Sequence, residues 1–217
     1  MKYQNAIFDL DGVLVDTAKY HYLAWNKIAG RLGFSFTLQD NERLKGVSRM
    51  DSLKILLSIG GLSLTDEEMQ RIAAEKNGYY LDYISRITPD ELLVGAKEIL
   101  AFFHKKGLNV SLGSASKNSR PILEKTGIAQ DFDCIIDGNC VTKAKPDPQV
   151  FTQSADRMQI SYGACIVFED SVAGIQAAKS VGMLAVGIGD PQSLRQADKV
   201  FPDLLQAKQY FSHFLAD

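Results

Sequence analysis

Five short apolar runs, separated by stretches of helical periodicity, limit most strongly how this chain can fold. The runs span Gln4–Asp9, Leu108–Gly113, Cys134–Asp137, Ala164–Glu169 and Met183–Ile188. This alternation is typical of βαβ units, in which parallel strands carry helices on both faces of the sheet. Gly107, Gly127 and Gly182 precede three of the runs, as expected where a helix ends before a strand. We therefore predict an α/β fold with a Rossmann-like core built on a parallel sheet.

One region breaks the alternation. From about residue 17 to residue 86 the pattern is helical and contains no convincing strand. Gly33 stands where a helix C-cap belongs, and a capping box at Thr65 opens a helix that continues toward Tyr83. We expect an all-helical cap domain of residues 16–87, inserted into a core formed by residues 1–15 and 88–217. Because the insertion leaves the core beside the end of the first strand, it is placed to close over that end.

Composition narrows the classes of partner. The formal net charge is −2, and no cluster of Lys and Arg provides a footprint for nucleic acid. The amino terminus lacks a signal-peptide apolar region, and no apolar stretch approaches the ~20 residues of a membrane span. Three cysteines without zinc-type spacing, among them Cys165 in an apolar run, indicate free thiols and a reducing compartment. We expect a cytoplasmic monomer that binds a small molecule and neither nucleic acid nor membrane.

Carboxylates end two of the predicted strands. The first strand leads into Asp9, Asp11 and Gly12, and the fourth ends in Glu169 and Asp170. Ligands of α/β proteins bind at the carboxyl ends of parallel strands. An acidic turn is the alternative interpretation of either motif alone, since Asp-Gly is a common turn dipeptide. Four carboxylates at neighbouring strand ends, however, are unstable without a divalent cation, and oxygen ligands alone favour Mg²⁺ over zinc.

Ser114 follows the second strand and begins a segment that leads into a helix. A small hydroxyl at a strand end, followed by the backbone donors of a helix start, can bind an anion. The alternative is that Ser116 or Asn118 merely caps the helix.

Lys145 lies in the same kind of position, before a further helix. We predict that Asp147 is the N-cap of that helix and that Pro148 is its first residue. An isolated lysine is usually solvated. Two acidic strand ends, one hydroxyl end and one lysine together nevertheless indicate a site for an anion and a cation.

This series of motifs resembles the haloacid dehalogenase superfamily, whose aspartate nucleophiles mostly transfer phosphoryl groups. The helical insertion resembles the type I cap of that superfamily. The four matching motifs, in chain order, are Asp9-Leu10-Asp11-Gly12, Ser114, Lys145 and Glu169-Asp170.

The resemblance implies a role for each motif. Asp9 is expected to be the nucleophile, and Asp11 to give and take protons at the sugar oxygen. Ser114 and Lys145 are expected to bind the oxygens of the transferring group. Mg²⁺ is expected to be held by Asp9, the backbone carbonyl of Asp11, Asp170 and Glu169.

Several motifs follow one another in the cap: Asp16-Thr17, then His21 and Trp25, then Lys45-Gly46-Val47-Ser48-Arg49, then Ser52, then Lys76-Asn77. This series resembles, more narrowly, the β-phosphoglucomutase family. That resemblance makes Arg49 the ligand of the phosphate that is not transferred, Lys76 a neighbour of the sugar phosphate, and His21 a support for Asp11. Each has a plainer alternative, since a His–Trp pair one turn apart is usually packing and single Arg or Lys residues are usually solvated. The residues expected to bind substrate are Trp25, Gly46, Val47, Ser48, Arg49, Ser52, Lys76, Ser114, Ala115, Ser116, Lys117 and Asn118.

The family resemblance implies a reaction. It is the interconversion of β-D-glucose 1-phosphate and D-glucose 6-phosphate, through an aspartyl phosphate and β-D-glucose 1,6-bisphosphate. A sugar-phosphate phosphatase with the same core and a less tightly closed cap is the alternative, and a non-catalytic phosphosugar-binding protein is a second one. Two departures from the family pattern touch none of these roles: Val94-Gly95 replaces a common Pro-Gly, and Lys143 adds a second lysine near Lys145.

Overall fold

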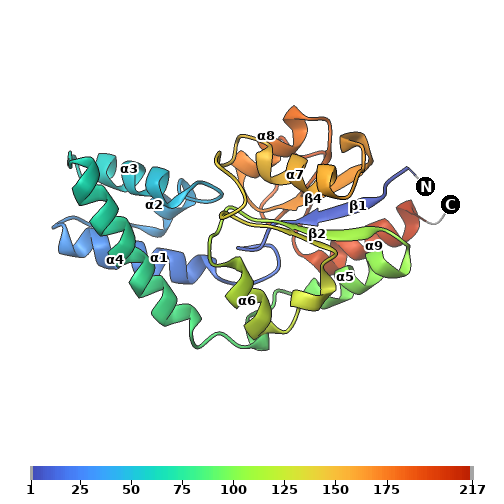
Figure 1. Cartoon of the computed structure of the whole chain (residues 1–217), viewed down its shortest axis with the longest axis horizontal. Helices are drawn as coiled ribbons and strands as arrows, with labels where there is room; N and C mark the ends of the chain where they lie inside the picture. Colours follow the sequence, from blue (N-terminus) through green and yellow to red (C-terminus); the bar gives the residue numbers. More distant parts are fainter. Residues whose placement is uncertain (1, 216–217) are drawn as a thin grey trace.

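The computed structural model describes residues 2–215 of the 217-residue chain. Six parallel strands form one sheet in the order β3-β2-β1-β4-β5-β6 (Figure 1). The first five confirm the strands predicted from the sequence, while the sixth was missed because it begins with an exposed lysine and none of its three residues is fully buried, so no apolar run marks it. The strands are β1 (Asn5–Phe8), β2 (Asn109–Gly113), β3 (Cys134–Ile136), β4 (Cys165–Glu169), β5 (Leu184–Ile188) and β6 (Lys199–Phe201).

Helices cover both faces of the sheet, as the apolar strands require. On one face, Phe8 stacks on Phe168 with ring centroids 4.5 Å apart, and Phe103 and Phe211 pack around the pair. Those two outer rings belong to α5 (Ala96–Lys105) and α9 (Leu204–Phe214), and α6 (Ser119–Thr126) lies on the same face. The opposite face carries α7 (Gln149–Arg157) and α8 (Val172–Ser180). Short 3₁₀ turns are η1 (Pro89–Glu91), η2 (Ala129–Asp131) and η3 (Tyr162–Ala164).

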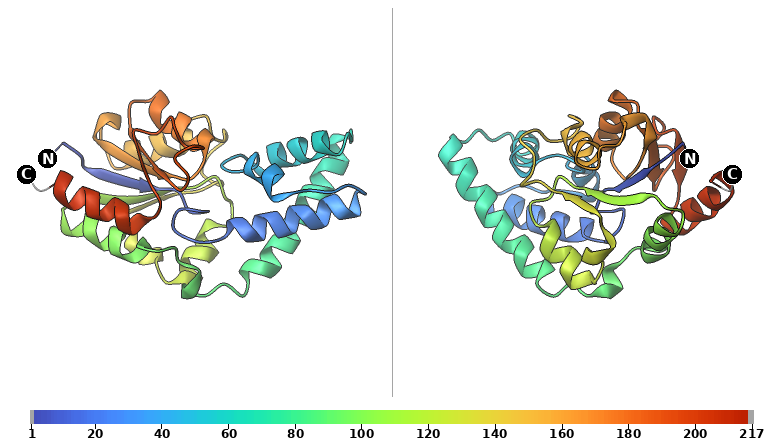
Figure 2. Two further views of the ribbon diagram at one scale, coloured as in Figure 1. Left: turned by 180° about the vertical axis from the view of Figure 1, so that it is seen from behind. Right: turned by 45° about the vertical axis from the view of Figure 1, so that its right-hand side comes forward.

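Four helices between β1 and α5 form the predicted helical insertion. They are α1 (Ala18–Arg31), α2 (Leu38–Glu42), α3 (Arg49–Ile59) and α4 (Asp66–Ile84). They have a hydrophobic core of their own around Trp25, Leu53 and Leu56, and they lie off the carboxyl ends of the strands (Figures 1 and 2). The Thr65 capping box begins α4 as predicted. The α/β core with an all-helical cap is therefore confirmed, whereas the domain limits at residues 15/16 and 87/88 stay a proposal.

The chain crosses between cap and core twice, and the two crossing segments are bonded to each other. Val15 forms an antiparallel bridge with Leu92. The Leu93 N–H donates to the Leu14 carbonyl at 2.9 Å. From the first turn of α1, the Tyr20 hydroxyl donates to the Glu91 carboxylate at 2.6 Å. The insertion is thus joined to the core through one short paired junction.

Local predictions elsewhere had mixed outcomes. Cys165 is fully buried and free, as expected. The predicted start of α7 was wrong by one position: Pro148 is the N-cap and the helix begins at Gln149. The reason is that the Asp147 side chain accepts the Gln149 N–H at 3.0 Å, forming a turn just before the helix. Within residues 2–215, none of the helices has the length and apolar character that crossing a membrane requires.

Candidate active site

A pocket of about 500 Å³ opens at the carboxyl ends of the strands, between core and cap. This is the position expected for a ligand site in a parallel α/β sheet. Ser114, Lys145 and Glu169 are buried behind its wall. The predicted residues that line the pocket are Asp9, Asp11, His21, Trp25, Gly46, Val47, Ser48, Arg49, Ser52, Lys76, Ala115, Ser116, Lys117, Asn118 and Asp170.

Lys145 is inserted among the carboxylates at the base of the pocket. Its ammonium donates to Asp9 Oδ1 at 2.6 Å and to Glu169 Oε1 at 2.5 Å, and its side chain is completely buried. The other Glu169 oxygen accepts the Ser171 hydroxyl at 2.8 Å. The structure therefore excludes the solvated alternative for Lys145.

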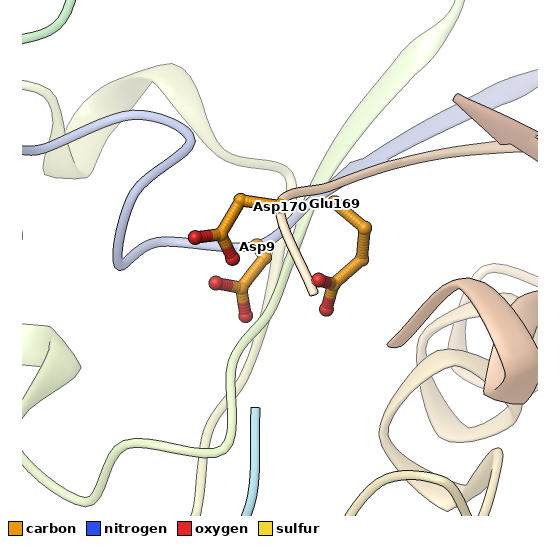
Figure 3. A group of neighbouring side chains, drawn as sticks. All are labelled: Asp9, Glu169 and Asp170. Atoms are coloured by element: carbon orange, nitrogen blue, oxygen red, sulfur yellow. The ribbon is translucent and has the colours of Figure 1, made fainter. Parts of the chain in front are cut away.

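Asp9, Glu169 and Asp170 turn their carboxylates toward one another (Figure 3). One oxygen of each lies within 4.8 Å of the others. Burial, and then the neighbouring Glu169, raises the pKa of Asp170 to about 7. Burial also holds the pKa of Asp9 well above its ordinary value, against the opposing charge of Lys145. When all three carboxylates are ionised, their charge exceeds that of the two nearby ammonium groups, Lys145 and Lys45, so the cluster carries an excess of negative charge.

Gly12 makes room for this cluster. Its φ is +81°, and a Cβ built there would lie 2.3 Å from Asp170 Oδ2. A hard cation prefers several carboxylate oxygens, so the donor set and its excess negative charge fit Mg²⁺. The part proposed for the backbone carbonyl of Asp11 stays a prediction.

The Asp11 side chain turns toward the cap instead of joining the acidic cluster. Its Oδ1 accepts a hydrogen bond from the Thr17 hydroxyl, and His21 Nε2 lies 3.6 Å away. Burial raises the pKa of Asp11, but the neighbouring His21 side chain and the hydrogen bond from Thr17 outweigh burial and leave this pKa below its ordinary value. The core carboxylate thus meets the cap at its first helix.

Lys76 is buried against aromatic rings in the cap. Its ammonium lies 5.0 Å from the centre of the Trp25 ring and 4.6 Å from that of Tyr80. Burial, and then the charge of Arg49, lowers the pKa of Lys76 to about 7. Sequence reasoning missed Tyr80, although its position one helical turn after Lys76 is a usable signal.

Three further contacts show that the cap is seated on the core. A Cβ built on Gly46 would lie 2.4 Å from the Ser171 hydroxyl. Lys45 Nζ lies 3.5 Å from Asp170 Oδ2. Asn118 Nδ2 donates to Asn77 Oδ1 at 3.0 Å. Lys45 and Thr17 belong to the motifs that carried the family resemblance, but we had not assigned them a role.

The serine segment forms a tight turn at the wall of the pocket. Ser114 Oγ accepts the Ser116 N–H at 3.1 Å, and Ser116 Oγ accepts the Asn118 N–H at 3.2 Å. Asn118 is the N-cap of α6 but makes no capping bond with its own side chain. Ser116 therefore accepts one N–H at the start of the helix while it also lines the pocket. A capping role for Ser116 is thus compatible with the prediction that this segment binds an anion.

Comparison with known proteins agrees with this geometry. A family model described as haloacid dehalogenase-like hydrolase matches residues 3–182. A β-phosphoglucomutase of Bacillus subtilis (strain 168) is 42% identical over 196 residues, which cover 89% of this chain and 87% of that protein. A fructose-1-phosphate phosphatase of Escherichia coli K12 is 30% identical over 189 residues, covering 86% and 97% of the two chains.

A solved structure is similar along almost the whole chain. The crystal structure of β-phosphoglucomutase from Clostridium difficile superposes with a TM-score of 0.93 at 39% identity, covering 99% of this chain and 97% of that one. The match extends over both the parallel-sheet core and the inserted helical cap. This chain is a member of the haloacid dehalogenase-like hydrolase family.

Proposed function

We propose that this protein is a β-phosphoglucomutase, which interconverts β-D-glucose 1-phosphate and D-glucose 6-phosphate. The observation that carries the proposal is that cap residues His21, Arg49 and Lys76 line the same pocket as Asp9 and Asp11. A sugar held there has a nucleophile on the core side and cations on the cap side. The 42% identity to the Bacillus subtilis enzyme supports the same assignment.

The chemistry follows from the positions of two aspartates. An Asp9 oxygen attacks the 1-phosphorus of β-D-glucose 1,6-bisphosphate, the bond from phosphorus to the sugar oxygen breaks, and that oxygen takes a proton from Asp11 in its acid form, which releases glucose 6-phosphate. The 6-hydroxyl of an incoming β-D-glucose 1-phosphate then attacks the aspartyl phosphate, the bond from phosphorus to Asp9 breaks, and the hydroxyl proton returns to Asp11, so that the bisphosphate forms again. The lowered pKa of Asp11 in this structure corresponds to the base form that the second step needs.

The groups around the two aspartates would offset the negative charge of the phosphates. Lys145 and Ser114 would bind oxygens of the transferring group, and the contact of Lys145 with Asp9 supports this role for the lysine. Asp9, Glu169 and Asp170 would hold Mg²⁺, which when bound offsets negative charge on the phosphoryl group. Arg49 suits the phosphate that is not transferred, because a guanidinium binds phosphate with two parallel hydrogen bonds.

A sugar-phosphate phosphatase is the second candidate. The 30% identity to the Escherichia coli fructose-1-phosphate phosphatase favours it, and the core residues serve hydrolysis equally well. What supports the mutase is the cap, because water must be kept from the aspartyl phosphate until the sugar re-attacks. A non-catalytic binding protein is the poorest candidate, since it has no use for a nucleophile beside a buried lysine.

The test is a coupled assay for glucose 6-phosphate. Purified protein with Mg²⁺ is given α- or β-glucose 1-phosphate, with and without glucose 1,6-bisphosphate, while released phosphate is measured in parallel. We expect turnover of the β anomer alone, stimulation by the bisphosphate, and little phosphate release. Phosphate release faster than isomerisation would replace the mutase assignment with the phosphatase.

A further inference from the structure

A lysine that no step above employs lines the active-site pocket. Lys143 lies two residues before Lys145, yet the two side chains have opposite environments. The Lys145 side chain is completely buried, whereas that of Lys143 is 70% exposed. Lys143 is nevertheless among the residues that line the pocket, together with Lys117 on the serine segment.

The backbone around Lys143 is held firmly in place. The N–H groups of Thr142 and Lys143 both donate to Gln149 Oε1, at 2.9 and 2.8 Å. The preceding part of the loop is bonded to the serine segment, because Asn139 Nδ2 donates to the Lys117 carbonyl at 3.0 Å. Lys143 therefore belongs to a fixed rim of the pocket.

The charges that line the pocket are divided by position. The carboxylates Asp9, Asp11 and Asp170 all follow the ends of strands, at the base. The cations that line it outnumber them, and they come from the cap and the surrounding loops. These cations are Lys45, Arg49, Lys76, Lys117 and Lys143. A ligand with negative charge at both ends fits this division, with one phosphate at the base and the other near the rim.

We propose that Lys143 binds the second phosphate of a bisphosphorylated sugar, from the core side of the pocket. This rests on the proposed function, because it assumes a substrate with two phosphates. The ion pair of Lys143 with Asp147, at 3.4 Å and exposed, does not prevent this role. Exposed ion pairs contribute little stability, and a phosphate dianion is the stronger partner.

The experiment measures binding in an Asp9→Asn background, in which the nucleophile is absent. Glucose 1,6-bisphosphate is titrated calorimetrically with Mg²⁺ present, at low and high ionic strength. We expect Lys143→Ala to raise the Kd roughly threefold to tenfold at low salt, with a smaller effect at high salt because exposed charges are screened. Lys143→Arg should restore most of the affinity. An unchanged Kd in Lys143→Ala would overturn the proposal.

Two matched variants separate phosphate binding from a structural role. Lys54→Ala removes a similarly exposed lysine whose ion pair, also 3.4 Å long, lies outside the pocket lining, and it should leave the Kd unchanged. Asp147→Asn keeps the oxygen that accepts the Gln149 N–H but removes the ion pair of Lys143. We expect Asp147→Asn to bind the bisphosphate as tightly as the parent or more tightly. If it instead weakens binding as Lys143→Ala does, the lysine acts by holding the loop, and the proposal is wrong.

The outcome does not depend on the assay of the reaction. If wild-type protein releases phosphate instead of isomerising the sugar, the proposed function fails while the titration still measures the contribution of Lys143. If the titration shows no difference between variants, the Lys143 proposal fails even though isomerisation is observed.

Discussion

The ammonium of Lys76 lies 2.9 Å from Nδ1 of His21. An ammonium has only hydrogens to donate, so Nδ1 accepts and the ring proton of a neutral His21 is on Nε2. That nitrogen faces Asp11 Oδ1, 3.6 Å away. Burial, and then the charge of Lys76, lowers the pKa of His21, which favours this neutral form. A buried cap lysine thereby orients the ring that faces Asp11 of the core.

Lys76→Met should stabilise the protein, most strongly at low pH. The folded pKa of about 7 lies below the 10.5 of the unfolded chain, so between these values the unfolded chain holds the proton more tightly. The cost of Lys76 is therefore complete below pH 7, on the order of a few kcal/mol, and disappears as the pH rises toward 10.5. Urea unfolding at pH 6.5 and pH 10 measures it.

The matched control for this variant is Lys27→Met. Lys27 also lies over a ring, 3.9 Å from the centre of Tyr79, but it is exposed. We expect its effect on the free energy of unfolding to be small and equal at the two pH values. A stability gain in Lys76→Met that is the same at both pH values would contradict burial as the cause.

Asp9→Asn should abolish turnover without unfolding the protein. The change removes the nucleophile while nearly conserving volume, and losses of roughly 10³-fold or more are expected for such groups. Without Mg²⁺ the variant should melt at a higher temperature than wild type, because one of three mutually repelling carboxylates is gone. Steady-state kinetics and calorimetry test the two parts, and turnover close to wild type would remove Asp9 as nucleophile.

Mg²⁺ should stabilise the protein more at pH 8 than at pH 5. The folded pKa of Asp170 is about 7, above its ordinary 3.8, so the metal-free protein loses stability as the pH rises through this interval. A bound cation offsets the charge that appears there. Melting curves with Mg²⁺ and with chelator at the two pH values provide the measurement, and Ca²⁺ should support activity poorly because it prefers more ligands at longer distances. Equal gains at both pH values, or full activity in chelator, would contradict a cation at this cluster.

Gly46→Ala should impair catalysis more than it impairs folding. Gly46 has a φ of +73°, and its added Cβ would meet Ser171 across the interface between cap and core. Gly33→Ala is the matched control, because Gly33 has a φ of +89° and open space around its Cβ position. Both changes should cost about 1–2 kcal/mol of stability through backbone strain. Only Gly46→Ala should lower kcat/KM, by roughly tenfold or more, and equal kinetic losses would show that strain alone is responsible.

Arg49→Ala should shift the products from isomer toward free phosphate. Losing a charge-assisted hydrogen bond costs about 1.5–3 kcal/mol, so mutase kcat/KM should fall roughly tenfold to a hundredfold. Hydrolysis of p-nitrophenyl phosphate, which has no second phosphate, should change less. Parallel assays of glucose 6-phosphate and released phosphate give the ratio. An unchanged ratio, with both activities reduced equally, would assign Arg49 to stability or to binding that the two reactions share.

The core could be predicted from the sequence because its signals are local. The buried strand before Asp9 can be recognised from consecutive apolar residues. The helix that begins after Thr65 can be recognised from its capping box. The β6 strand has only three residues, with its first exposed, so no periodicity marks it. The start of α7 was misjudged because an Asp side chain caps either a helix or a turn, and only the backbone decides which.

The contacts within the site depend on long-range geometry that residue order alone does not contain. In the sequence, Lys145 resembles any lysine of a loop. Only the folded structure brings its ammonium to Asp9, which is 136 positions away in the chain. Lys45 and Asp170 meet only when the cap rests on the core. The family resemblance provided candidate roles for Asp9, Lys145 and Asp170 but none for Lys45, and those roles stay predictions until variants are assayed.

The paired junction at Val15 and Leu92 allows the cap and the sheet to change separately during evolution. Because both chain crossings lie beside this junction, substitutions in the outer parts of helices α1–α4, which have a hydrophobic core of their own, can reshape the cap side of the pocket without moving β1, which positions Asp9. The end of α4 nearest the sheet is different, because Tyr80 and Ile84 pack in the same hydrophobic cluster as the strands. A chain built in this way can acquire a new substrate by altering one module while the other keeps its reaction.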